Sequence, residues 1–279
     1  MDINKINIVA DSSSDMAVFS EIPFCSAPLK IITANKEYID NENLNVEAMV
    51  DDLLKYSGKS STACPSPDDW LTAFGDSEYV FCVTITSNLS GSYNSACTAK
   101  GLYEEQYPDR KVYVVDSLST GPEMQLIIEK IAVLINDGKE FDDICKYITE
   151  YCKHTGLLFM LESMKNLANN GRVSPLVAKA AGLLGIRVVG RASDQGTLEV
   201  IEKCRGEKKA LPAIVENMRK LGFNGGKVII NHCFNPEAAK KLKNLILEKF
   251  ENANIIIGKC RGLCSFYAEK GGMLIGFEH

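Results

Sequence analysis

The chain has 279 residues, enough for roughly two domains of about 150 residues or for one large α/β domain. It is 46% hydrophobic and 24% charged with a mean hydropathy of −0.05, which is typical of a globular protein and excludes a disordered, collagen-like or coiled-coil chain. The net charge of −5 comes from 31 basic and 36 acidic residues. Because the basic residues form no stripe, we expect no nucleic-acid partner.

The sequence also argues against a membrane span, a disulfide framework and a metal site. Its most apolar segments, 157–161 and 183–189, are far shorter than the roughly 18 residues of a spanning helix. The amino terminus lacks the basic and apolar regions of a secretory signal, which predicts a cytoplasmic protein. The ten cysteines are spread from Cys25 to Cys264, so we expect free thiols. Cys260 and Cys264 have a metal-compatible spacing, but no second pair follows, and we expect no metal.

The first half of the chain alternates β-branched runs with helical patterns. Strands are predicted at 6–10, 79–86 and 112–116. Helices are predicted at 45–54, from a capping-box pattern at 66–69, at 126–135 and at 142–152. This βαβ alternation favours a parallel sheet.

The pattern changes after residue 155. Leu157–Leu161 predicts a strand, residues 164–184 predict helical pieces, and residues 186–201 predict a hairpin that turns at 194–196. Further along come helices at 208–221 and 236–250 and strands at 227–231, 255–257 and 273–277. We therefore predict a two-domain α/β protein, with a parallel-sheet N-terminal domain at 1–155 and a smaller mixed α/β C-terminal domain at 156–279.

Three hydroxyl-rich segments follow directly after predicted strands, at residues 11–15, 86–92 and 116–121. In an open parallel sheet the loops beyond the carboxyl ends of the strands meet at one crevice, so these segments are predicted to line one pocket. Gly91 allows backbone to approach a ligand closely, and the start of the next helix directs free N–H groups at an anion. Neutral donors of this kind favour an anionic ligand. The alternative is that each Ser or Thr only caps its own helix.

Arg172 and His232 are further candidates outside these segments. Arg172 follows Gly171, and its guanidinium group suits the oxygens of a carboxylate or phosphate, although a surface arginine is the alternative. His232 follows the predicted strand 227–231, where it is either a ligand contact or a structural hydrogen-bond donor.

The sequence carries no familiar catalytic motif. Neither Ser90 nor Ser117 lies in a Gly-x-Ser-x-Gly elbow or a Ser-x-x-Lys motif. Asp11 and Asp15 are too widely spaced for the aspartate pair of a magnesium-dependent phosphatase, and no phosphate-binding or dinucleotide-binding glycine motif is present. We therefore assign no catalytic residue.

Several stretches, taken in order, resemble the DegV family over nearly the whole chain: 8–13, 62–67, 86–93, 115–117, 171–174 and 231–232. The resemblance implies a bacterial protein with the EDD fold, in which two α/β domains enclose a long-chain fatty acid. It also implies that a fatty acid kinase subunit phosphorylates the carboxyl group of that acid. Carried over position by position, the resemblance implies that the carboxylate is held by Thr62, Ser90, Gly91 and Ser92. The residues then implied near the head group are Ser12, Ser13, Asp116, Ser117, Arg172, His232 and Tyr267.

The chain departs from the family pattern at its carboxyl-terminal motif and near the expected entrance. Tyr267 stands where the pattern has His, and Glu269-Lys270 stands where it has Gly-Pro, which affects the expected phosphate handling and kinase partnership. Ala63-Cys64 replaces Ser-Gln, and Asn170 replaces a glycine before Arg172.

We expect a non-catalytic protein that binds a fatty acid such as palmitate, stearate or oleate, without a cofactor and with transient membrane contact. Burying about 14 methylenes contributes roughly 11 kcal/mol, before subtracting the several kcal/mol that immobilisation costs. One alternative is a hydrolase or phosphotransfer enzyme that acts on a small acidic or phosphorylated substrate, with His232 or Asp11 as its acid or base. Another is an interaction module whose cleft binds a segment of a partner protein.

Overall fold

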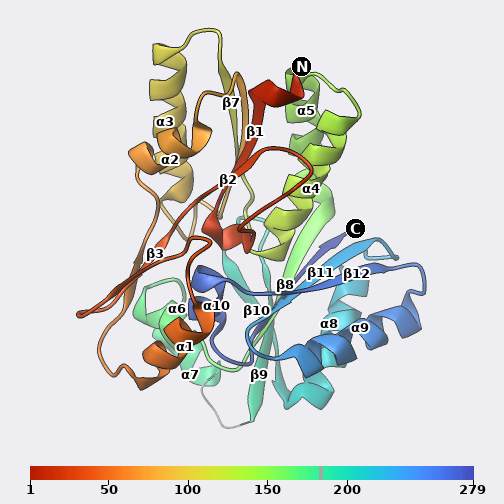
Figure 1. Ribbon diagram of the computed structural model, residues 1–279. Coiled ribbons are helices and arrows are strands. Elements are labelled where there is room, and N and C mark those ends of the chain that lie inside the picture. Colours follow the sequence, from red (N-terminus) through yellow and green to blue (C-terminus); the bar gives the residue numbers. More distant parts are fainter. Residues whose placement is uncertain (182–184) are drawn as a thin grey trace.

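The computed structural model describes the backbone of residues 1–181 and 185–279 and the side chains outside 179–184. A parallel sheet of strand order β2-β1-β6-β7 forms one end of the molecule (Figure 1); the parallel sheet was predicted, whereas its edge strand β2 was not. Its strands are β1 (Ile6–Asp11), β2 (Phe24–Ala27), β6 (Tyr79–Thr84) and β7 (Lys111–Asp116). β6 ends two residues earlier than predicted, because the amide of Thr86 donates to the carbonyl of Ser119 (2.9 Å) instead of continuing the ladder.

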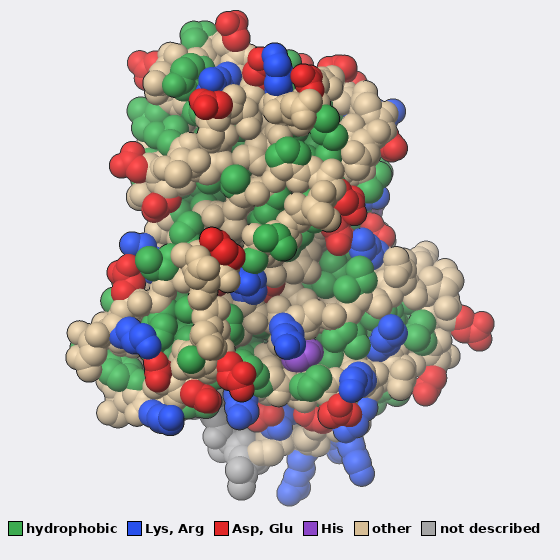
Figure 2. Space-filling view, in the orientation of Figure 1, with side chains coloured by type: hydrophobic (Ala, Val, Ile, Leu, Met, Phe, Trp, Pro, Cys, Tyr) green, Lys and Arg blue, Asp and Glu red, His purple; other side chains and the backbone are tan. Residues whose placement is uncertain are grey.

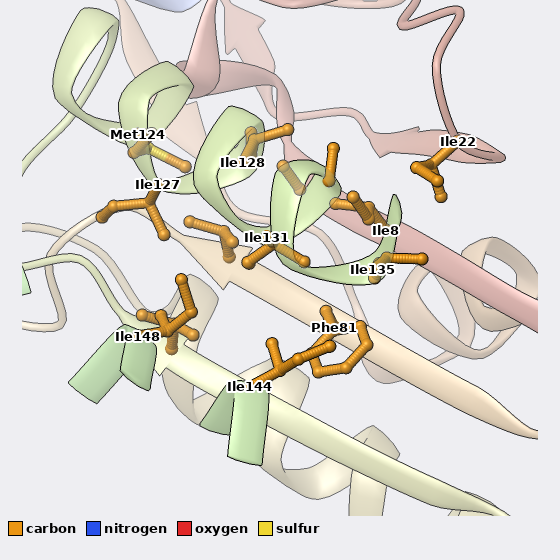
Figure 3. Close-up of a cluster of buried hydrophobic side chains, with 14 of the residues drawn as sticks. Ile8, Ile22, Phe81, Met124, Ile127, Ile128, Ile131, Ile135, Ile144 and Ile148 are labelled. Carbon is orange, nitrogen blue, oxygen red and sulfur yellow. The ribbon is translucent and has the colours of Figure 1, made fainter. Parts of the chain in front are cut away.

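Helices cover both faces of this sheet. The helices are α2 (Pro67–Phe74) and α3 (Ser92–Gln106) on one face, and α4 (Pro122–Asn136) and α5 (Phe141–Tyr151) on the other. Side chains alternate along each strand, so Ile8 and Phe81 pack with α4 and α5 in the cluster of Figure 3, whereas Val9 and Cys82 pack with Trp70 of α2. The predicted capping box of α2 is present, with Ser66 and Asp69 bonded reciprocally.

A mixed sheet of order β10-β9-β8-β13-β11-β12 forms the other end of the molecule. Its strands are β8 (Thr155–Leu161), β9 (Ile186–Ala192), β10 (Leu198–Arg205), β11 (Lys227–His232), β12 (Asn254–Lys259) and β13 (Met273–Glu278). The predicted β9–β10 hairpin is present, and only β11 and β12 pair in parallel. Helices α8 (Glu207–Lys220) and α9 (Pro236–Lys249) pack on one face in a continuous apolar cluster. These two sheets confirm the predicted α/β class.

Short helices α6 (Lys165–Asn169) and α7 (Pro175–Ala181) occupy part of the segment predicted as helical. The rest of that prediction, residues 182–184, lies outside the described residues. Single turns of 3-10 helix, namely η1 (Ile3–Lys5), η2 (Ser12–Ser14) and η3 (Cys152–His154), complete the helical elements described. No helix in the described ranges has the length and apolar character needed to cross a membrane.

The structure contains a small antiparallel sheet and a terminal helix that the sequence did not predict. The sheet has the order β4-β3-β5, and its strands are β3 (Lys30–Ile32), β4 (Glu37–Ile39) and β5 (Ser61–Ala63). Helix α1 (Val46–Lys55) follows β4. The terminal helix α10 (Gly262–Ala268) precedes β13. Ile31, Tyr38 and Met49 from the first part pack with Phe266 of α10. Figure 1 shows β3 and α1 lying beside α10. The small sheet and α1, from the first part of the chain, therefore contact α10 from the second part. The domain boundary near residue 155 stays a prediction.

Close backbone packing joins α4 to the second sheet. A Cβ at Gly276 of β13 would lie 2.6 Å from backbone atoms of Pro122 and Glu123, so only glycine allows this approach. The buried carboxylate of Glu123 accepts a hydrogen bond from Thr155 Oγ1 (2.8 Å) at the start of β8. Burial raises the pKa of Glu123 to about 7, while the nearby hydroxyls of Ser119 and Thr155 oppose the shift.

A distant aspartate caps helix α10. The carboxylate of Asp40 accepts hydrogen bonds from the amides of Gly262 (3.0 Å) and Leu263 (2.8 Å), in the first turn of a helix whose own N-cap, Arg261, gives no side-chain bond. Asp40 is 1% exposed. Burial raises its pKa, and the donors of Leu263 and Gly262 and the charge of Arg261 oppose that shift. Asp40 thus fixes α10 against the small sheet.

We predict that Asp40→Ala lowers the free energy of unfolding by about 2–3 kcal/mol, because two buried amides lose a charged acceptor. Urea unfolding followed by circular dichroism measures the loss. Asp51→Ala, at an exposed position of α1, is the control and should stay within about 0.5 kcal/mol of the wild type. Equal stability of the two variants would contradict the capping role.

A second prediction concerns pH. Because the pKa of Glu123 is raised to about 7 in the folded state, its contribution to stability is complete below its unfolded pKa and is lost as the pH rises through about 7. Glu123→Gln keeps an acceptor for Thr155 but does not ionise. Relative to the wild type it should gain about 2 kcal/mol between roughly pH 5 and pH 8 in urea unfolding.

The exposed Glu105→Gln substitution is the matched control for this experiment and should follow the wild-type curve. Asp15, whose pKa burial also raises to about 7, titrates in the same window in all three proteins, so only the difference between variants reports on Glu123. Parallel curves for the wild type and Glu123→Gln would show that Glu123 does not contribute in this range.

Candidate functional site

An apolar cavity lies between the two sheets and is roofed by α10. Its empty space is about 680 Å³, counting the part open to solvent. Leucine dominates the lining, with other apolar side chains filling the gaps. The apolar lining residues are Leu29, Ile85, Leu89, Leu157, Phe159, Leu161, Leu167, Leu198, Leu263, Cys264, Ala268 and Leu274. A cavity with this apolar lining suits an apolar ligand.

The strand periodicity of β8 explains how one sheet both lines the cavity and builds a core. Leu157, Phe159 and Leu161 face the cavity, while Leu158 and Met160 face α8 and α9 on the other side of the sheet. β13 behaves in the same way, because Leu274 lines the cavity and its two neighbours join the opposite core. A continuous apolar run in the sequence therefore marks a strand that is covered on both faces.

Three polar residues of the lining contact one another, and Ser90 follows in the chain a residue that one of them binds. The Thr62 hydroxyl of β5 and the Tyr267 hydroxyl of α10 are 2.8 Å apart. The guanidinium carbon of Arg172 lies 5.9 Å from the centre of the Tyr267 ring, and its Nε donates to the carbonyl of Leu89 (3.1 Å), next to Ser90. We call Thr62, Ser90, Arg172 and Tyr267 the polar cluster. The structure thus brings together four of the residues that the sequence proposed.

The hydroxyl and guanidinium groups of this cluster are hydrogen-bond donors for an anion. Burial raises the pKa of Tyr267, against the effects of Thr62 and Arg172, so the phenol stays protonated and able to donate at neutral pH. Arg172 also borders a surface groove that shares Leu89, Arg172 and Leu198 with the cavity. The cavity therefore opens toward solvent beside the charged member of the cluster.

The first predicted hydroxyl loop surrounds a buried carboxylate instead of lining the cavity. Asp11, at the end of β1, accepts hydrogen bonds from the hydroxyls of Ser13 and Ser92 and from the amide of Ile85 (2.9 Å). Burial raises the pKa of Asp11, and these bonds oppose the shift. Ser12 Oγ accepts from the amide of Leu29 (3.0 Å). Ser12, Ser13 and Ser92 thus satisfy buried polar groups behind the lining.

Gly91, Asp116 and Ser117 also lie outside the set of residues that line the cavity. Gly91 is the N-cap of α3, and a Cβ there would lie 3.2 Å from Cys64 Sγ. Asp116 accepts from the amides of Ser87 and Leu118, both at 3.1 Å. Asp116 and Ser117 line a separate hollow. Leu157 lines both this hollow and the apolar cavity.

His232 is buried at the end of β11 and does not line the cavity. Its Nδ1 accepts from the amide of Asn235 (3.2 Å), just before α9. Burial, together with the charge of Lys259, lowers the pKa of His232, so it is neutral at pH 7. The sequence left open whether His232 contacts a ligand or has a structural role, and the structure gives it the structural role. Neither His232 nor Asp11 reaches the cavity as an acid or base.

The polar groups of the described lining are hydroxyls, a thiol and a guanidinium group. None of the described lining residues is Asp, Glu, His or Lys. Across the described ranges, no group of three His, Cys, Asp or Glu is arranged to hold a metal ion. The cysteines in the described structure are free, as predicted.

Sequence reasoning missed the contribution of α10 and of Thr120. The lining residues of α10 form two pairs spaced four residues apart, which is the spacing of one helical face. The pairs are Leu263 with Tyr267 and Cys264 with Ala268. That signal was available, although the helix is only seven residues long. Thr120, whose hydroxyl is 3.7 Å from Cys264 Sγ, lies in a hydroxyl segment that the sequence did flag.

A family model described as "Uncharacterised protein, DegV family" matches residues 5–278. A DegV domain-containing protein of Streptococcus gordonii is 44% identical over 275 residues, which cover 97% of this chain and 98% of that protein.

Two solved structures are also similar to this chain. One is a DegV family protein from Eubacterium eligens loaded with heptadecanoic acid, with 44% identity and a TM-score of 0.96 over 98% of this chain and 99% of that one. The other is the Fatty Acid Kinase (Fak) B3 protein of Streptococcus pneumoniae loaded with linoleic acid, with 42% identity, a TM-score of 0.96 and the same coverage of both chains. These matches confirm the resemblance seen in the sequence, and the chain belongs to the DegV family.

Proposed function

We propose that this protein binds one long-chain fatty acid in the cavity and holds its carboxylate at the polar cluster, without catalysing a reaction. The observation that carries the proposal is a leucine-lined cavity whose linked polar residues are hydroxyls and a guanidinium group. The absence of Asp, Glu, His and Lys among the described lining residues favours binding over the hydrolase or phosphotransfer alternative.

The apolar tail supplies most of the affinity. Burial of a chain with about 14 methylenes contributes roughly 11 kcal/mol, from which the cost of immobilising the ligand must be subtracted. The carboxylate contributes orientation, because an anion leaves water only when donors compensate for its lost hydration. Thr62, Ser90, Arg172 and Tyr267 are donors of the lining that would meet the carboxylate, and Thr120 adds a further hydroxyl.

The other residues suggested by the sequence take supporting roles in this proposal. Gly91 and Ser92 begin α3 beside Ser90, whose Oγ accepts from the Ser92 amide (3.3 Å). They would place the start of the helix near the carboxylate. Ser12, Ser13, Asp116, Ser117 and His232 would hold the surrounding loops. In the same proposal residues 1–155 and 156–279 act as two lobes that close on the acyl chain.

The relatives support the ligand class and suggest a partner. The similar proteins of E. eligens and S. pneumoniae are loaded with heptadecanoic and linoleic acid, and the second is named as part of a fatty acid kinase. We extend both features to this chain: it would bind acids such as palmitate, stearate or oleate and present the carboxylate to a fatty acid kinase subunit. It would do so in the cytoplasm, with transient membrane contact and without a cofactor.

The direct test is organic extraction of the purified protein followed by mass spectrometry. We expect one acyl chain per protein, or its uptake when oleate or palmitate is added to delipidated protein. Acid and phosphate ester substrates should not be turned over. A protein that neither contains nor takes up acyl lipid would contradict the proposal, and turnover that depends on His232 would favour the enzyme instead.

We predict that Thr62→Ala and Ser90→Ala each weaken oleate binding about tenfold, because each removes a donor from the buried carboxylate. Calorimetric titration of delipidated protein measures the change, and melting temperatures should stay near that of the wild type. Thr98→Ala, on the exposed side of α3, is the control. Affinity unchanged in both variants would remove Thr62 and Ser90 from the proposed site.

A further inference from the structure

Glu269, directly after α10, has a backbone conformation that side chains rarely adopt. Its φ is 54° and its ψ is 172°. Glycine populates this region freely, whereas a residue with a Cβ is strained there and persists only when other contacts hold it. Glu269 is also one of the residues at which this chain departs from the family pattern. We therefore expect contacts of the Glu269 side chain to stabilise this backbone conformation.

Those contacts are with the start of α6. Glu269 Oε1 accepts hydrogen bonds from the hydroxyl of Ser163 (3.0 Å) and from the amide of Asn166 (3.2 Å). The Asn166 side chain in turn donates to the carbonyl of Phe266 (2.8 Å) in α10. A carboxylate at this place satisfies free amides at the helix start and opposes the positive end of the helix dipole. Three hydrogen bonds therefore fasten the start of α6 to the end of α10.

The other end of α6 places Arg172 at the mouth of the cavity. The amide of Arg172 donates to the carbonyl of Leu167 (2.8 Å), closing the turn around Gly171, which has a φ of 75°. The Arg172 side chain then bonds to the carbonyls of Asn170 (2.5 Å) and Leu89 (3.1 Å). Because α6 has only five residues, its start and the turn that carries Arg172 lie close together along the chain.

Glu269 and Tyr267 lie two residues apart. The end of α10 therefore carries one member of the polar cluster, Tyr267, and contacts the helix α6 that precedes another, Arg172. Tyr267 lines the cavity, bonds Thr62 and lies under the guanidinium group. Glu269 does not line the cavity, although it borders a separate surface hollow between α1, α6 and α10. The hydrogen bonds of its side chain to Ser163 and Asn166 therefore reach the cluster by way of the start of α6.

We infer that Glu269 is a positioning residue: its carboxylate anchors α6 so that Arg172 is held over Tyr267 and faces an anionic head group at the cavity mouth. The inference rests on the proposed function, because the head group is the carboxylate of a fatty acid. The strained backbone of Glu269 is retained because a glycine there could not supply the anchoring carboxylate.

Glu269→Gly tests the inference without introducing strain, because glycine accepts the observed φ and ψ. We expect the melting temperature to remain near that of the wild type and the dissociation of oleate to become about fivefold faster. Stopped-flow transfer of a fluorescent fatty acid to albumin measures the rate. Oleyl alcohol, which has the same tail and no carboxylate, should dissociate from both proteins at equal rates. Equal effects on the acid and the alcohol would overturn the inference, since they would indicate a general loosening of the wall.

A double-mutant comparison separates positioning from direct binding. If Glu269 acts through Arg172, then Glu269→Gly adds nothing to the loss of affinity caused by Arg172→Ala. Additive losses would overturn the inference. Glu269→Gln keeps an oxygen acceptor for Ser163 and Asn166 and should retain most of the wild-type rate. Lys270→Ala, at the exposed neighbouring position, is the matched control.

The outcomes also distinguish this inference from the proposed function. If the wild-type protein binds no fatty acid, the proposed function fails and the inference fails with it. If the wild type binds oleate and Glu269→Gly releases it at the wild-type rate, the function stands and the positioning role of Glu269 is rejected.

Discussion

An apolar cavity in a folded protein persists only where its walls resist collapse, because unfilled space lined by leucine costs dispersion energy. Directional polar bonds are one means of holding the walls in place. Three buried carboxylates supply such bonds around this cavity. Asp11 binds the ends of β6 and α3, and Asp40 binds the start of α10. Asp15 accepts from the Asn231 side chain (3.0 Å) and the Arg261 amide (2.7 Å), which belong to the second sheet and the segment before α10. Together these bonds fix the elements that line the hollow.

The same carboxylates join the two parts of the chain. Asp15 and Asp40 come from the first part and their donors from the second, so the space between the sheets is bounded by hydrogen bonds with defined directions. Burial raises the pKa of both groups, to about 7 for Asp15. Their ionised forms are therefore costly, and the amide and side-chain donors around them offset part of that cost.

In the proposed function, an anion at the polar cluster would meet hydrogen-bond donors and no carboxylate of the described lining. Acidic groups lie behind the described lining, where they support loops, while the polar cluster presents hydroxyls and the guanidinium of Arg172. On the surface shown in Figure 2, acidic and basic side chains are interspersed with apolar ones over both ends of the molecule. The net charge of −5 thus does not prevent a local site for a carboxylate.

The sequence by itself determined the α/β class, the parallel sheet, most helices and the family, because these depend on local periodicity, capping residues and short motifs. It also suggested Ser90 and Arg172, from the hydroxyl segment 86–92 and from the guanidinium group after Gly171, and Thr62 and Tyr267 through the resemblance; the structure places all four in the lining of one cavity. Only the tertiary structure decided that Ser13 and Ser92 bind Asp11, that His232 supports a loop, and that α10 roofs the cavity. The physical reason is that a hydroxyl or an imidazole has the same local signature whether it faces a ligand or a buried partner. The small β4-β3-β5 sheet was missed because its strands have three residues each and obtain their stability from distant contacts with α10.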